Sequence, residues 1–173
     1  HNSQTAYSLE MRYNIQQLYQ VDGIGNDYRW SAWYTYNDVT KKWKLDKLTD
    51  SYVLNNNENS RPAGQIRGIN MIRLSEMYYI AAECAETVSE DVNYLDQVRS
   101  HRGLTSYALD RSMSKDNLAQ EIRKEYKKEF WGEGQLWYYY KRKMDMTFST
   151  YMTDIKFFTF EIPDIEQSNA GRE

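Results

Sequence analysis

Helical hydrophobic spacing dominates this chain of 173 residues and alternates with polar, turn-rich stretches. Apolar side chains recur at helical spacing between Met11 and Tyr19, which predicts a helix over residues 3–20. Glycine and asparagine at 21–27 end this helix, and the polar stretch 55–64 is typical of an exposed loop.

Two stronger helical patterns follow one another closely. Residues 71–87 carry a broad apolar face that includes Leu74 and Met77. Residues 91–102 form the second pattern, and Gly103 suits the left-handed position that ends a helix. Because the connection between them is short, we expect the two helices to lie antiparallel as neighbours.

The C-terminal half predicts two more helices and an extended tail over 146–173. Ser114 is a suitable N-cap for the first helix. Gly132 and Gly134 separate it from the second, at 135–143. Four apolar residues of the first helix follow at steps of four: Leu118, Ile122, Tyr126 and Phe130. The expected fold is therefore mainly α, with tetratricopeptide-like antiparallel helix pairs.

Residues 28–48 form an aromatic segment that lacks the helical spacing of apolar residues. Its aromatic and β-branched side chains favour extended structure, and Asn37-Asp38 is a turn signal. In an extended chain Tyr34 and Tyr36 share one side, as do Tyr28 and Trp30. We expect an irregular hairpin or loop excursion beside the helices.

Composition excludes several classes of protein. The 16 Tyr and 5 Trp compensate for few aliphatic residues, and the net charge is only −3. A mean hydropathy of −0.87 argues against a membrane-spanning helix, and a pI near 5.5 against a nucleic-acid partner. One cysteine and two histidines leave no disulfide and no zinc site, so we expect neither metal nor cofactor.

The carboxylates do not form a recognisable catalytic motif. A glycosidase needs two of them on either side of a sugar bond. Here Glu121, Glu125 and Glu129 alternate with Lys and Arg along one predicted helix, which is typical of a solvated face with ion pairs. Cys84 lies among alanines and is interpreted as a small apolar residue. The sequence therefore predicts no enzyme, and a glycoside hydrolase fragment has no local support.

Aromatic rings are the remaining chemical signal, because rings stack on the apolar faces of sugars. The short excursion cannot bury all of its rings, so some are expected to face solvent as a binding surface. Packing of each ring against the helices is the alternative interpretation. The candidate ligand-binding residues are Arg29, Trp30, Trp33, Tyr34, Tyr36 and Trp43.

Four segments, in order, resemble motifs of the SusD/RagB family, and Asp27-Tyr28-Arg29 matches its common Asp-x-Arg. Tyr126 stands where an Arg is common in the family. Pairing of Arg142 with Glu129 or Glu133 is expected to join two motif helices. The four segments are Arg73–Glu83, Leu95–Gly103, Ile122–Arg142 and Phe160–Glu166.

The resemblance implies a surface lipoprotein of the outer membrane that is not an enzyme. It implies binding of a polysaccharide, oligosaccharide or other nutrient, and a SusC-like TonB-dependent transporter as partner. It also implies that residues 1–173 are the C-terminal part of the domain, with the lipid anchor in a region that precedes them. A helical-repeat interaction module without a small ligand of its own is the alternative function.

Overall fold

The computed structural model describes residues 15–20, 27–47, 72–148 and 154–163. The chain divides into two compact units, residues 1–132 and 133–173, which are described separately. The predictions for 21–26 and 55–64, and for the start of the first helix, lie outside the described residues.

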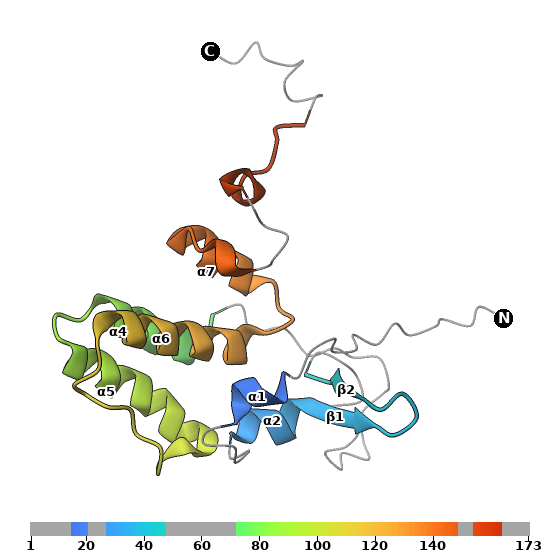
Figure 1. The fold of residues 1–173 in the computed structure, drawn as a ribbon, viewed down its shortest axis with the longest axis horizontal. Helices are drawn as coiled ribbons and strands as arrows, with labels where there is room; N and C mark the ends of the chain where they lie inside the picture. The colour runs from blue at the N-terminus through green and yellow to red at the C-terminus, as the bar shows by residue number, and fades with distance from the viewer. Residues whose placement is uncertain (1–14, 21–26, 48–71, 149–153, 164–173) are drawn as a thin grey trace. The chain divides into compact units, whose positions relative to one another are not determined.

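Helices dominate the described part of the first unit (Figure 1). They are α1 (Gln16–Tyr19), α2 (Tyr28–Trp33), α4 (Leu74–Cys84), α5 (Val88–Arg99) and α6 (Lys115–Phe130). Helix α4 packs against both α5 and α6, and α1 packs against α2 and α6. The mainly helical fold with antiparallel pairs is confirmed.

The ends of the central helices follow from local capping. Thr87 and Glu90 form a capping box at the start of α5. After α5 a π-helical turn covers Ser100–Leu104, and Gly103 takes the left-handed conformation expected of it, with φ of 85°. The Ser114 hydroxyl accepts a hydrogen bond from the Asn117 amide, which confirms the predicted N-cap of α6.

Helix α6 buries the residues that its pattern predicts, whereas α4 does not. Leu118, Ile122, Tyr126 and Phe130 of α6 are all buried. On α4 the buried side chains are Ser75, Tyr79 and Ala82, while Leu74, Met77 and Cys84 are exposed. The predicted apolar face of α4 is therefore wrong for Leu74, Met77 and Cys84, whereas Ala82 lies inside as predicted. Where α4 meets α6, the contact includes the rings of Tyr79 and Tyr126.

Residues 28–33 form a helix and not the predicted extended segment. The carboxylate of Asp27 accepts a hydrogen bond from the Arg29 amide and caps α2. The predicted hairpin begins only after this helix, with β1 (Tyr34–Asn37) and β2 (Lys42–Leu45) paired antiparallel.

The described part of the second unit contains α7 (Gln135–Lys143) and two 3₁₀ helices, at Met146–Phe148 and Ile155–Phe158. Within this unit the Trp137 and Phe160 rings stack, with centroids 5.1 Å apart. The 3₁₀ helices interrupt the predicted extended tail. At the second one, the Asp154 carboxylate accepts a hydrogen bond from the Lys156 amide and starts the helical turn.

Candidate functional site

One face of the β1–β2 hairpin carries the aromatic side chains. Tyr34 pairs with Leu45 and Tyr36 with Trp43, so these four residues share that face. At the turn, the Asn37 side-chain oxygen accepts hydrogen bonds from the amides of the second and third residues after it. The hairpin register is thus set by both the turn and the ring pairs.

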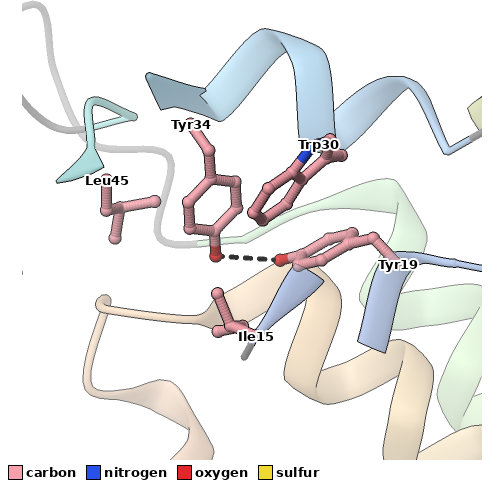
Figure 2. Close-up of a cluster of buried hydrophobic side chains, with 5 residues drawn as sticks. All are labelled: Ile15, Tyr19, Trp30, Tyr34 and Leu45. Atoms are coloured by element: carbon pink, nitrogen blue, oxygen red, sulfur yellow. Dashed lines mark hydrogen bonds between the residues drawn. The ribbon is translucent and has the colours of Figure 1, made fainter. Parts of the chain in front are cut away.

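The end of the hairpin face near α2 is part of the protein core. Figure 2 shows the aromatic core, formed by Ile15, Tyr19, Trp30, Tyr34 and Leu45. The rings of Trp30 and Tyr34 stack with centroids 4.6 Å apart and an interplanar angle of 22°. The hydroxyls of Tyr19 and Tyr34 lie 3.1 Å apart and share a hydrogen bond. The core therefore holds the base of the hairpin rigidly.

The end of the hairpin face near the turn is more open. Tyr36 is 40% exposed, and its ring meets the half-buried Trp43 edge to face at 5.2 Å. The ring of Trp43 also contacts that of Trp30, with centroids 4.5 Å apart, which connects Tyr36 and Trp43 to the aromatic core. Trp33 is half-buried, and the Lys47 ammonium lies 3.8 Å from the centre of its ring.

The structure divides the six predicted ligand-binding residues into two groups. Arg29, Trp30 and Tyr34 are buried, so they are not among the side chains that face solvent, and the two rings pack inside as the alternative interpretation expects. The two rings are buried because α2 and the hairpin fold over α1, and the guanidinium because carboxylates surround it. Trp33, Tyr36 and Trp43 keep part of their surface in solvent, and ligand binding by these three stays a prediction.

Arg29 lies at the centre of a buried set of charges that we call the charged cluster. Its guanidinium is 2.7 Å from an Asp27 oxygen, 2.7 Å from Glu125 and 3.2 Å from Glu129. The pair with Asp27 is bidentate, with Arg29 Nε at 2.9 Å from Asp27 Oδ1 and Nη2 at 2.7 Å from Oδ2. One cation thereby joins α2 to α6.

The other members of the charged cluster surround the two glutamates of α6. Glu125 contacts Lys128 at 2.8 Å and Arg99 at 3.3 Å. Glu129 contacts Arg102 at 2.9 Å and Arg73 at 3.7 Å. Glu125, Glu129 and Lys128 are buried, so the prediction of a solvated face is wrong for these residues. It holds for Lys124, which is exposed and pairs with the half-buried Glu121.

The charged cluster keeps its two glutamates ionised. Burial by itself raises the pKa of Glu125, but the charges of Arg29, Lys128 and Arg99 outweigh it and hold that pKa well below its usual range. For Glu129, Arg102 is the main charge that lowers the pKa against burial. Both glutamates are therefore fixed anions, unlike a general acid, which must hold a proton.

The C-terminus of α6 receives hydrogen bonds from three distant segments. The Tyr19 hydroxyl donates to the Lys128 carbonyl at 2.9 Å. Lys47 and Arg73 both donate to the Glu129 carbonyl, the latter at 3.2 Å. These donors satisfy carbonyls that a helix end leaves without partners, and the cations complement its negative dipole.

Sequence reasoning found most members of the charged cluster as motif residues but missed that Asp27, Arg29 and Arg99 are buried. Asp27, Arg29, Arg73, Arg99 and Arg102 all lie within the segments that resemble family motifs. Their recurrence in separate motifs was the available signal that they meet in space. The expected ion pair of Arg142 stays a prediction.

The described ranges contain neither a metal-binding cluster nor a membrane-spanning helix. In these residues, no three or more of His, Cys, Asp and Glu are arranged to hold a metal ion. No helix in the same part of the chain has the length and apolar character that crossing a bilayer requires.

Comparison with known proteins gives a family assignment. No curated protein and no solved structure matches the chain significantly. A model of the SusD family matches residues 3–173, which is nearly the whole chain. The chain therefore belongs to the SusD family, whose members are non-catalytic binding proteins.

Proposed function

We propose that the chain binds a glycan at the open end of its aromatic hairpin and presents it for import by a SusC-like TonB-dependent transporter. Membership of the SusD family implies nutrient binding together with such a transporter, and a place on the outer-membrane surface. The observation that supports the hairpin as the site is the exposed ring of Tyr36 beside the half-buried ring of Trp43.

The chemistry of the hairpin suits a saccharide. Aromatic rings offer flat apolar faces to sugar C–H groups, and the phenol hydroxyl of Tyr36 can exchange hydrogen bonds with sugar hydroxyls. The rings are held from behind by Trp30 and the aromatic core, so little conformational freedom is lost when a ligand binds. Trp33, which is also half-buried, offers a third ring with the Lys47 ammonium beside it.

Replacing Tyr36 with alanine tests this proposal. We expect Tyr36→Ala to weaken saccharide binding by about tenfold, equivalent to roughly 1.4 kcal/mol, because one stacking ring is lost. Calorimetry with a panel of oligosaccharides measures the change, with dissociation constants expected at about micromolar to millimolar. The ring is partly exposed, so the melting temperature should change little.

Tyr94→Ala provides a matched control for this experiment. Tyr94 of α5 is 41% exposed, nearly the same as Tyr36, but it lies outside the hairpin. The hairpin would not be the site if Tyr36→Ala bound saccharide as tightly as the wild type does. It would also not be the site if Tyr36→Ala and Tyr94→Ala lost the same amount of affinity.

A protein-interaction module without its own ligand is the second candidate. It is favoured by the exposed apolar residues Leu74, Met77 and Ile80 on α4. If this function is correct, Met77→Asp will abolish co-purification with the co-expressed transporter, while the wild type binds no saccharide. Saccharide binding that depends on Tyr36 would support the first candidate instead.

A further inference from the structure

The side of α4 that meets α6 carries two buried hydroxyl groups. Ser75 and Tyr79 lie one helical turn apart and are 7% and 0% exposed. Neither Ser75 Oγ nor the Tyr79 hydroxyl has a hydrogen-bond partner among the described residues. Because an unpaired buried hydroxyl costs free energy, native proteins pair nearly all such groups. These two hydroxyls therefore require a partner.

The Tyr79 hydroxyl lies in the electrostatic field of the charged cluster. Its ring packs on Tyr126 of α6, with centroids 5.1 Å apart. Burial raises the pKa of Tyr79, and the negative charge of Glu125 raises it further, while Arg29 acts in the opposite direction. The hydroxyl consequently keeps its proton and can both donate and accept a hydrogen bond.

The chemistry of these surroundings selects the partner. Glu125 and Glu129 already contact cations at 3.3 Å or less, so another ion of either sign would meet like charges at short range. A neutral molecule that donates and accepts hydrogen bonds fits both the hydroxyls and the carboxylates. Water meets this requirement, and buried water typically bonds to about three polar groups that lack other partners.

We propose that an ordered water molecule in the α4–α6 contact links Ser75 Oγ and the Tyr79 hydroxyl to the carboxylates of the charged cluster. The water accepts a hydrogen bond from Tyr79 and donates one to the carboxylate of Glu125. The water thereby connects α4 to the charged cluster. A second connection is the ion pair of Arg73, the residue that precedes α4, with Glu129. The helix is then positioned by a hydrated polar contact as well as by ring packing.

Tyr79→Phe tests the proposal without changing the ring packing. A high-resolution crystal structure of the wild-type chain should contain a water within hydrogen-bond distance of the Tyr79 hydroxyl, and the variant should lose it. We expect the variant to melt about 2–4 °C lower. Tyr94→Phe, which alters an exposed phenol, should melt like the wild type.

The double variant tests whether one water serves both hydroxyls. If it does, Ser75→Ala combined with Tyr79→Phe will lower the melting temperature by less than the sum of the two single changes, because both remove the same bridge. Additive losses would overturn the shared water. A melting temperature of Tyr79→Phe equal to or above that of the wild type, or a direct protein partner for the hydroxyl, would overturn the proposal as a whole.

Discussion

Arg29 is the residue whose removal should harm the fold strongly. It is 2% exposed and contacts the carboxylates of Asp27, Glu125 and Glu129. Replacing it with methionine keeps much of the volume but leaves buried anions with fewer partners. We expect Arg29→Met to lower the free energy of unfolding by about 3–5 kcal/mol, measured by urea denaturation.

Lys124→Met is the matched control for this change. Lys124 also pairs with a glutamate of α6, at 2.5 Å from Glu121, but its side chain is 50% exposed. We expect Lys124→Met to lower the free energy of unfolding by only about 0.5 kcal/mol or less. If both variants lose a similar free energy of unfolding, the buried ion pairs of the charged cluster stabilise the fold no more than an exposed pair does.

The buried hydroxyl and charged side chains also explain why the sequence did not predict correctly which individual residues are buried. Hydropathy assigned Leu74 and Met77 of α4 to the interior, where the fold instead places Ser75 and Tyr79. A hydrophobic pattern contains no information about a partner surface that is itself charged. The buried state of Glu125 was missed for the same reason.

Among the elements, the end of α6 depends on glycine in a way that can be tested. Gly132 and Gly134 have φ of 80° and 81°, a region that other residues enter at a cost of about 1–2 kcal/mol. A methyl group added at Gly132 would lie 2.7 Å from Leu45 Cδ2, whereas one at Gly134 meets nothing within 4 Å.

We therefore expect Gly132→Ala to lower the free energy of unfolding by more than Gly134→Ala does. Because φ is nearly the same at both positions, the difference reports mainly the clash with Leu45 of the aromatic core. Urea denaturation followed by circular dichroism measures both variants. Equal losses would indicate that Leu45 moves aside without cost.

The elements also differ in how well local sequence predicts them. Helix α6 was predicted from its cap and its apolar steps because both signals lie within the helix. Helix α2 was predicted as extended because Tyr and Trp favour strands. Its helix depends on Asp27 and on the contact of Arg29 with Glu125, a residue 96 positions away, which no local pattern contains.

For the molecule as a whole, the charged cluster predicts sensitivity to acid. The pKa values of Glu125 and Glu129 are lowered in the fold, whereas unfolded glutamates take up protons near about pH 4.3. The stabilisation is therefore present above that pH and is lost as the pH falls toward the lower folded values. Asp91, whose pKa burial raises, acts in the opposite direction.

We expect the free energy of unfolding to decrease from about pH 5 downward, measured by urea denaturation at a series of pH values. Glu125→Gln should flatten this dependence, because the amide does not titrate. The same slope in the variant and the wild type would assign the acid sensitivity to other carboxylates.

The reach of Arg29 along the chain has a consequence for how the protein is made. Its guanidinium bonds to residues 96 and 100 positions later, and Tyr19 bonds to a carbonyl 109 positions later. Contacts between such distant residues require large loops to close and are associated with slow folding. During synthesis on the ribosome, Arg29 and Tyr19 can make these contacts only after α6 has emerged.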